Sequence, residues 1–235
     1  MKNVIKQLPT QYSVDNYYRF SQLKQSDIKD KRILDIGCGY GWCTLLLKDA
    51  GAKHVVGTEI TEADLSTAKA HIDDERISFE VASAIELPFE DNSFDTIVSW
   101  EVLEHIPKNT EENMFREVQR VLKPSGTFYM STPHRHPVSN LLDPAWMLFG
   151  HHRHYSKQQL RSYAKQAKLK PEQVGTVGGW WMMLATLNLY ISKWIFRRPP
   201  IRHDWWQAKI KTDFVISDRK FANLFAVFTK WPSSK

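Results

Sequence analysis

The stretch Arg32-Ile33-Leu34-Asp35-Ile36-Gly37-Cys38-Gly39-Tyr40-Gly41-Trp42 contains the pattern that decides the fold. It begins with an apolar run, interrupted by Asp35, of the kind found in buried parallel strands. Three glycines at alternate positions follow, and Cys43-Thr44-Leu45-Leu46-Leu47 is typical of the apolar start of a helix. Because glycine has no Cβ, it permits a tight turn and a close approach of a ligand to the backbone. The stretch therefore predicts a strand, a glycine turn and a helix that together hold a nucleotide.

The spacing of the glycines indicates which kind of nucleotide. A dinucleotide fingerprint has a third glycine three residues after the second, and Trp42 occupies that position. The run Val55-Val56-Gly57-Thr58-Glu59 predicts the next strand, and Glu59 follows Gly37 by 22 positions. A carboxylate about 20 residues after the first glycine can accept hydrogen bonds from the hydroxyls of a ribose. The spacing argues against NAD and favours another ligand that contains a ribose.

Three motifs resemble those of a known family. The pattern Asp-x-Gly-x-Gly-x-Gly at 35–41 resembles the first motif of class I S-adenosylmethionine-dependent methyltransferases. Residues 82–95 resemble the loop with which this family covers the adenine, except that Ser83 replaces the usual aspartate. The run V-L-E-H-I at 102–106 is similar to the branch that includes ubiquinone- and menaquinone-biosynthesis methyltransferases. The resemblance extends from about Arg32 to Pro133.

The resemblance implies a single α/β domain over residues 1–235. We expect a Rossmann-like, doubly wound sheet of seven strands in the order 3-2-1-4-5-7-6, with the last strand antiparallel. Three further segments complete the expected domain: a helical cap at 1–31, a substrate loop at 134–157, and an apolar and basic helical insertion at 178–212 before the last strand.

The resemblance also implies S-adenosylmethionine as cofactor and indicates which residues hold it. Glu59 is expected at the ribose and Ser83 and Ala84 at the adenine, where a serine hydroxyl accepts more weakly than a carboxylate. The expected cofactor-binding residues are Asp35, Ile36, Gly37, Cys38, Gly39, Glu59, Ile60, Ser83, Ala84 and Trp100.

Methyl transfer from a sulfonium needs mainly an aligned, desolvated acceptor, and a hydroxyl acceptor also gains from a general base. The candidates for this base are Glu101, His105 and His134. For His105 a packing role is the alternative. The segment 134–157 holds five histidines, but no cysteine or carboxylate cluster accompanies them. We therefore expect no metal site.

Composition places the chain among ordinary globular proteins, with 42% hydrophobic and 25% charged residues in 235. Its two cysteines, Cys38 and Cys43, lie at the glycine turn and form no disulfide framework, which favours a reducing compartment. The start of the chain, 1–6, has no apolar core after it, so we expect no secretory signal. Together these features predict a cytoplasmic protein.

The last quarter of the chain differs from the rest. Residues 193–235 contain ten Lys or Arg against three Asp, and six of the nine tryptophans lie between 180 and 231. Residues 180–196 are apolar but shorter than a membrane span of about 20 residues. Two interpretations remain open for 180–211: peripheral contact with an anionic membrane, or a lid over the substrate pocket.

These features favour a methyltransferase whose acceptor is a small molecule, lipophilic or presented at a membrane. An RNA methyltransferase is an alternative suggested by the pI of 9.2. However, no RNA-binding module is recognisable and no Asn-Pro motif follows Ser99, so nucleic acid is not the expected partner. A cofactor-binding scaffold without turnover is the third interpretation, suggested by Ser83. The sequence indicates neither the oligomeric state nor the acceptor.

Overall fold

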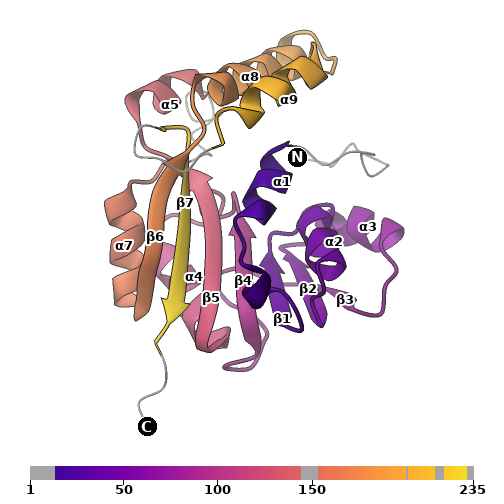
Figure 1. Ribbon diagram of the computed structural model, residues 1–235, viewed down its shortest axis with the longest axis vertical. Helices are drawn as coiled ribbons and strands as arrows, with labels where there is room; N and C mark the ends of the chain where they lie inside the picture. Colours follow the sequence, from indigo (N-terminus) through magenta and orange to yellow (C-terminus); the bar gives the residue numbers. More distant parts are fainter. Residues whose placement is uncertain (1–13, 144–152, 200, 215–219, 232–235) are drawn as a thin grey trace.

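The computed structural model describes residues 14–143, 153–199, 201–214 and 220–231. Within these residues seven strands form one sheet in the order β3-β2-β1-β4-β5-β7-β6 (Figure 1). The first five strands are parallel, and β7 runs antiparallel to both β5 and β6. The predicted fold and strand order are confirmed. The strands are β1 (Arg32–Ile36), β2 (His54–Glu59), β3 (Ile77–Val81), β4 (Phe94–Trp100), β5 (Leu122–Pro133), β6 (Leu169–Val177) and β7 (Asn223–Lys230).

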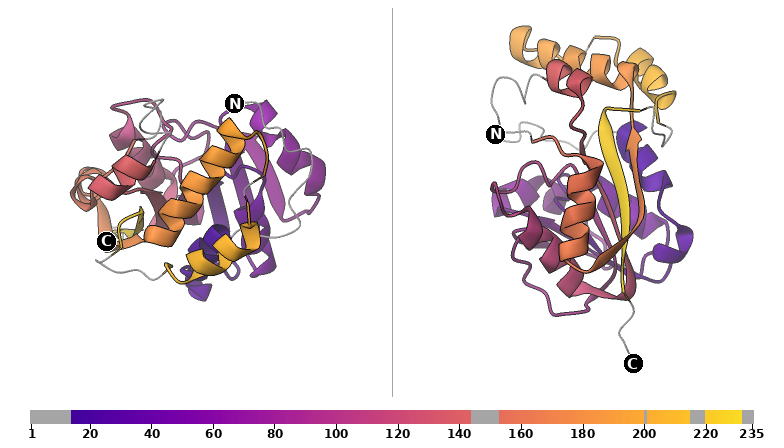
Figure 2. Two further views of the ribbon diagram at one scale, coloured as in Figure 1. Left: turned by 90° about the horizontal axis from the view of Figure 1, so that it is seen from above. Right: turned by 90° about the vertical axis from the view of Figure 1, so that its left-hand side faces the viewer.

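Helices connect these strands and cover both faces of the sheet (Figure 2). The predicted glycine turn lies between β1 and α2, and the predicted cap contains α1 and a short 3₁₀ turn, η1. In order the helices are α1 (Val14–Ser21), η1 (Gln25–Asp27), α2 (Trp42–Asp49), α3 (Glu62–His71), α4 (Glu111–Val121), α5 (Pro137–Leu142), α7 (Lys157–Gln166), α8 (Trp180–Tyr190), the π-helical turn η2 (Ile191–Ile195) and α9 (His203–Lys211).

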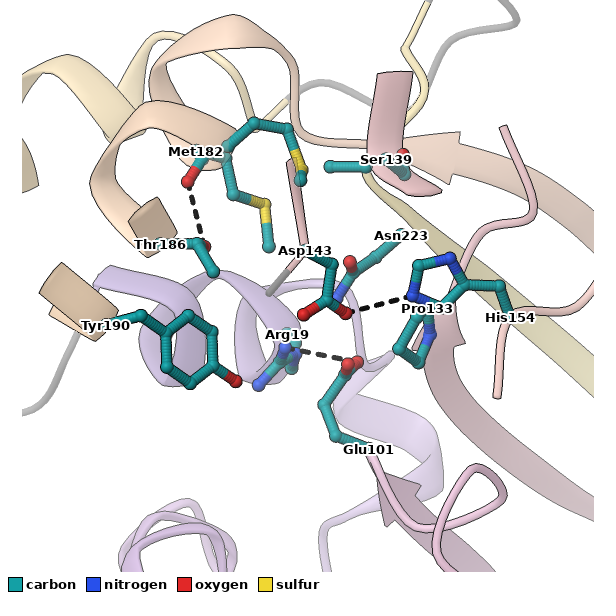
Figure 3. A pocket seen from close by; sticks show the side chains of 12 residues that line it. Arg19, Glu101, Pro133, Ser139, Asp143, His154, Met182, Thr186, Tyr190 and Asn223 are labelled. Carbon is teal, nitrogen blue, oxygen red and sulfur yellow. Dashed lines mark hydrogen bonds and ion pairs between the residues drawn. The ribbon is translucent and has the colours of Figure 1, made fainter. Parts of the chain in front are cut away.

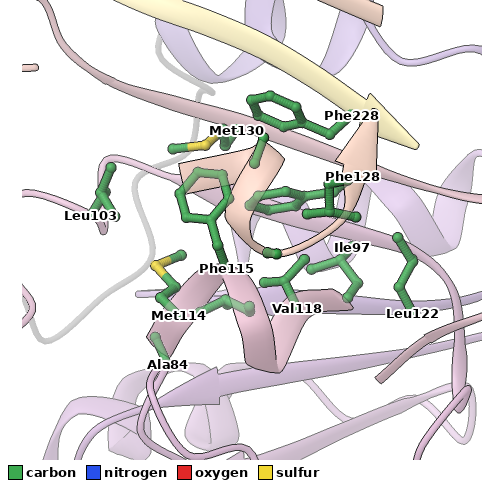
Figure 4. Close-up of a cluster of buried hydrophobic side chains, with 14 of the residues drawn as sticks. Ala84, Ile97, Leu103, Met114, Phe115, Val118, Leu122, Phe128, Met130 and Phe228 are labelled. Atoms are coloured by element: carbon green, nitrogen blue, oxygen red, sulfur yellow. The ribbon is translucent and has the colours of Figure 1, made fainter. Parts of the chain in front are cut away.

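The alternation of side chains along the central strands divides the core into two clusters. On β5, Phe128 packs against α4 on one face, whereas the neighbouring Tyr129 packs on the other face with residues of α1 and α2. Phe115 of α4 meets Phe128 and Phe228 edge-on, with ring centroids 6.0 and 5.7 Å apart (Figure 4). Such aromatic burial fixes α4 on the sheet, and with it the loop between β4 and α4 that enters the site.

The insertion before β7 lies over the carboxyl end of the sheet, where α8 and α9 run beside each other and α8 contacts α5 (Figure 1). The apolar run at 180–196 is α8 continued by η2. A third apolar cluster joins this insertion to the body: Met182, Met183, Ile210, Phe214 and Ala222. Helix α1 joins it too, because Tyr18 stacks on Phe214 with ring centroids 4.3 Å apart. Among the described residues, no helix has the length and apolar character needed to cross a bilayer.

The three predicted segments are each described only in part, and the insertion at 178–212 lacks only residue 200. Residues 1–13 of the expected cap and residues 144–152 of the expected substrate loop, with His151 and His152, lie outside the described residues. The rest of that loop forms α5 and a short bridge between His134 and Tyr155.

Candidate functional site

The glycine turn after β1 adopts backbone conformations that favour glycine. Gly37, Gly39 and Gly41 have φ angles of 70°, 55° and 80°, in the left-handed region. A Cβ on Gly37 would lie 2.4 Å from Val102 Cγ2, whereas a Cβ on Gly39 would meet nothing within 4 Å. The turn is therefore packed at its first glycine and open at its second.

Glu59 at the end of β2 closes this turn from the opposite side. The Gly39 N–H donates a hydrogen bond of 2.7 Å to Glu59 Oε1. Burial raises the pKa of this carboxyl, and the bond from Gly39 opposes the rise. The sequence separation of Gly37 and Glu59 thus corresponds to a direct contact between the end of β2 and the turn.

A cavity of about 510 Å³ lies beside the turn, a volume within the usual range of small-molecule sites. It contains three carboxylates and no lysine or arginine, which suits a cationic ligand. The cofactor implied by the sequence has a sulfonium and an ammonium group, so the residues present fit it. The lining residues are Ile36, Gly37, Glu59, Ile60, Asp64, Ala82, Ser83, Ala84, Glu101, Val102, His105, Ile106 and Pro107.

Four of the expected cofactor-binding residues do not line this cavity: Asp35, Cys38, Gly39 and Trp100. Asp35 is buried and accepts a 2.7 Å hydrogen bond from Thr44 Oγ1. Its burial raises the pKa to about 7. Gly39 reaches the cavity through its bond to Glu59.

Cys38 and Trp100 are packed into the protein. Cys38 is buried, and burial raises the pKa of its thiol. The Trp100 indole N–H donates to Cys43 Sγ at 3.1 Å, and its ring stacks on Phe225. Trp100 therefore packs on the face of the sheet that α2 covers. A direct contact of Cys38 or Trp100 with the cofactor stays a prediction.

Glu101, the first residue after β4, stands where two cavities meet. It has a φ of 55°, unusual for a residue with a side chain, and it lines both cavities. Its Oε1 accepts a 2.5 Å hydrogen bond from Ser131 Oγ and lies 3.2 Å from Arg19 Nη2. Sequence reasoning found Glu101 but missed Arg19, which α1 delivers from far away in the chain.

The second cavity, of about 150 Å³, lies between α1, α5, α8 and the adjoining ends of β5 and β7 (Figure 3). It combines methionine side chains with polar groups. Its lining residues are Arg19, Glu101, Pro133, Ser139, Asp143, His154, Met182, Met183, Thr186, Tyr190, Ala222 and Asn223.

Among the described histidines of the predicted substrate loop, His154 reaches this cavity. Its Nε2 lies 2.9 Å from Asp143 Oδ2 and its Nδ1 lies 2.7 Å from Asn140 Oδ1. Both ring nitrogens are therefore occupied, and the buried ring ties α5 to the chain that leads into α7. The His154 side chain therefore has a structural role in this arrangement.

The other ionisable residues near Glu101 are placed differently. His105 is exposed at the first cavity. Glu104 is buried behind it, accepts from Thr132 Oγ1 at 3.0 Å, and has a pKa raised by burial and then by Glu101.

His134 lines neither cavity. Its Nδ1 lies 3.1 Å from the Phe221 carbonyl oxygen, and burial lowers the pKa of the ring. The geometry therefore separates the three catalytic candidates: Glu101 lies at the junction, His105 at the margin of one cavity, and His134 outside both. Within the described ranges, no group of three or more His, Cys, Asp or Glu side chains could hold a metal.

Comparison of the chain with known proteins finds similar methyltransferases. Residues 33–126 match a methyltransferase domain. A ubiquinone biosynthesis O-methyltransferase of Dechloromonas aromatica is 31% identical over 157 residues, covering 61% of this chain and 66% of that protein. The 27-O-demethylrifamycin SV methyltransferase of Amycolatopsis mediterranei is 40% identical over 100 residues, covering 40% and 36%. The chain thus spans about one third to two thirds of the length of these relatives.

Solved structures resemble nearly the whole chain. An S-adenosylmethionine-dependent methyltransferase from Mesorhizobium loti has a TM-score of 0.65 at 20% identity, over 93% of this chain and 98% of that chain. A putative methyltransferase in complex with the Haloferax volcanii Trm112 methyltransferase activator has a TM-score of 0.68 at 19% identity, over 93% and 89%. At these identities the likeness concerns the fold.

Proposed function

Because the chain belongs to the class I S-adenosylmethionine-dependent methyltransferases, we propose that it methylates a hydroxyl group of a small-molecule acceptor. One observation carries this proposal: a cavity that fits the cofactor meets a second cavity at the carboxylate of Glu101. Two relatives act on small molecules according to their names, a ubiquinone precursor and a rifamycin.

In this proposal the first cavity holds the cofactor. Glu59 accepts from the ribose hydroxyls, Ser83 and the backbone of Ala84 meet the adenine, and Ile36 and Gly37 form the floor. When bound, S-adenosylmethionine supplies a methyl group on a positively charged sulfur that keeps the bonding electron pair when the methyl leaves. The three carboxylates of the cavity favour such a cation electrostatically.

Glu101 is the base in this proposal. An acceptor hydroxyl in the second cavity would be within reach of a carboxylate that lines both cavities. The proton passes from the hydroxyl oxygen to Glu101 and then to water. The acceptor oxygen therefore does not become positively charged as it forms its new bond to the methyl carbon. His105 and His134 are less suited, because neither lines the second cavity.

The test is to incubate the protein with radiolabelled S-adenosylmethionine and fractionated extract. Label in the lipid or polar small-molecule pools would support the proposal. Label in RNA alone would identify the protein as an RNA methyltransferase. Calorimetric binding of the cofactor with no transfer to any pool would identify a scaffold without turnover.

The acceptor is lipophilic in this proposal and is presented at an anionic membrane surface. Helices α8 and α9 with η2 expose large apolar side chains, among them Trp180, Ile195 and Phe196 at 57%, 69% and 55% exposure. Basic side chains lie among them: Arg198 packs over the Phe196 ring, and Lys209 lies 5.1 Å from the centre of the Trp181 ring. Tryptophan and basic residues both suit the headgroup region of an anionic leaflet.

Flotation with vesicles of phosphatidylcholine and phosphatidylserine tests this membrane contact. The protein should float with them at low salt and separate as salt screens the surface charge. Ile195→Ser with Phe196→Ser should abolish flotation, whereas Leu141→Ser, an equally exposed apolar position on α5, should reduce it less. A protein that ignores such vesicles at every salt concentration would refute the membrane contact and favour a soluble acceptor.

A further inference from the structure

The 150 Å³ cavity contains polar groups that the fold itself leaves unused. We propose that this cavity is a subsite for one hydroxylated six-membered ring, held by Glu101 Oε2, the Tyr190 hydroxyl and the Asn223 amide. This inference rests on the proposed function and adds the chemical class of the acceptor and the residues that recognise it.

The first unused group is one oxygen of Glu101. Both contacts of this carboxylate, with Ser131 and with Arg19, are made by Oε1. Within the described part of the chain, Oε2 has no hydrogen-bond partner. Arg19 and Ser131 thus act as positioning residues: they fix one oxygen and leave the other to accept from a ring hydroxyl. Figure 3 shows the contact between Arg19 and Glu101.

The second unused group is the amide of Asn223, the first residue of β7. The residue is only 8% exposed, and amides with so little exposure normally have hydrogen-bond partners. Among the described residues the one fully enclosed side-chain atom without a partner is Ser99 Oγ. The Asn223 amide, which forms no hydrogen bond with a described residue, is therefore open to the cavity that it lines. An amide can both donate and accept, so it can bind a hydroxyl in either sense.

The third unused group is the Tyr190 hydroxyl, at the end of α8. It lines the cavity and has no hydrogen bond to the described residues. Burial and then the nearby Asp143 raise its pKa to about 12, so it remains protonated and can donate. The three groups come from separate parts of the chain and line the same cavity, where Figure 3 shows Arg19 between Tyr190 and Glu101.

The size and the walls of the cavity indicate a ring. A cavity of about 150 Å³ can accept a molecule of the size of benzene. Met182, Met183 and Pro133 supply apolar surface beside the three polar groups, and thioethers pack well against ring edges and faces. An acyclic charged acceptor fits less well, because the acidic and basic groups here already pair, Arg19 with Glu101 and His154 with Asp143.

Binding of three ring probes tests the subsite without knowledge of the natural acceptor. The probes are 1,2-dihydroxybenzene for a phenolic ring, myo-inositol for a saturated ring, and toluene as the ring without hydroxyls. Affinities would be measured by saturation-transfer NMR in the presence of S-adenosylhomocysteine. We expect one of the hydroxylated rings to bind at least fivefold more tightly than toluene, and the preferred ring identifies the acceptor as phenolic or saturated.

Two variants assign the binding to this cavity. Tyr190→Phe and Asn223→Leu should each weaken the preferred ring roughly fivefold to tenfold, the loss of one hydrogen bond. Tyr163→Phe, the same change on α7 outside the cavity, should leave the affinity unchanged. Tyr190→Phe removes only one oxygen, so it keeps the test valid if Asn223→Leu folds poorly.

The outcomes separate this inference from the proposed function. If calorimetry shows that S-adenosylhomocysteine binds but none of the three rings binds, the ring subsite is wrong and the proposed function is unaffected. Equal binding of toluene, or ring affinities that neither cavity variant changes, also overturns the ring subsite. Failure of S-adenosylhomocysteine itself to bind would instead count against the proposed function.

Discussion

Gly37 offers a prediction whose size follows from the geometry of the turn. In Gly37→Ala the left-handed φ of 70° costs a residue with a Cβ about 1–2 kcal/mol. The new methyl would lie 2.4 Å from Val102 Cγ2, and such overpacking adds about 1–3 kcal/mol. The smaller entropy of the unfolded chain offsets about 0.4–1 kcal/mol. We expect the free energy of unfolding to fall by roughly 1–5 kcal/mol.

Gly39→Ala is the matched control, because its φ is also left-handed, at 55°, but its Cβ would meet nothing within 4 Å. It should cost only the backbone term, about 0–1.5 kcal/mol net. Urea denaturation of both variants measures the difference between their free energies of unfolding. This difference should disappear in a Val102→Ala background, which removes the clashing methyl. Equal stabilities of the two glycine variants would refute the packing argument.

Three further predictions concern the site. Glu59→Ala should weaken S-adenosylmethionine binding about tenfold to a hundredfold in calorimetry, because it removes the partner of Gly39 and the expected ribose acceptor; unchanged affinity would contradict this. Asp35→Asn should raise stability relative to the wild type at pH 8 but not at pH 4. The native pKa of Asp35, raised to about 7, means that the wild type loses stability as pH rises from about 4 to 7. If urea denaturation gives the same stability difference between Asp35→Asn and the wild type at pH 4 and at pH 8, the prediction is wrong. Glu101→Gln should lower the rate of methyl transfer about a hundredfold or more with cofactor affinity little changed, and loss of cofactor binding instead would assign Glu101 to the first cavity alone.

The sheet and the glycine turn could be predicted because each depends on local sequence. Strand β1, the turn and Glu59 all lie within 28 residues, and the strand–helix alternation after them allows few topologies. The motif could not show which of its residues face the ligand space. Asp35 belongs to it and yet turns toward Thr44, because side chains on successive strand positions point to opposite faces.

The second cavity could not be predicted because its residues come from separate parts of the chain. Arg19, Ser139, Tyr190 and Asn223 lie on four elements that meet only after the insertion packs over the sheet. Each residue alone is an ordinary polar side chain with no motif around it. A weak signal existed for Arg19, which lies in an aromatic run at 17–20 and is the one charged residue there.

The sequence presented the 180–211 segment as either a pocket lid or a membrane contact, and the geometry makes these compatible. Met182, Thr186 and Tyr190 recur at helical spacing and line the second cavity, whereas Trp180 and Leu184 on the same helix are exposed. One helix can therefore cover a subsite with one face and present apolar side chains outward with the other. The two roles should separate by mutation: substitutions on the inner face should change ring binding without changing vesicle flotation, and substitutions on the outer face should do the reverse.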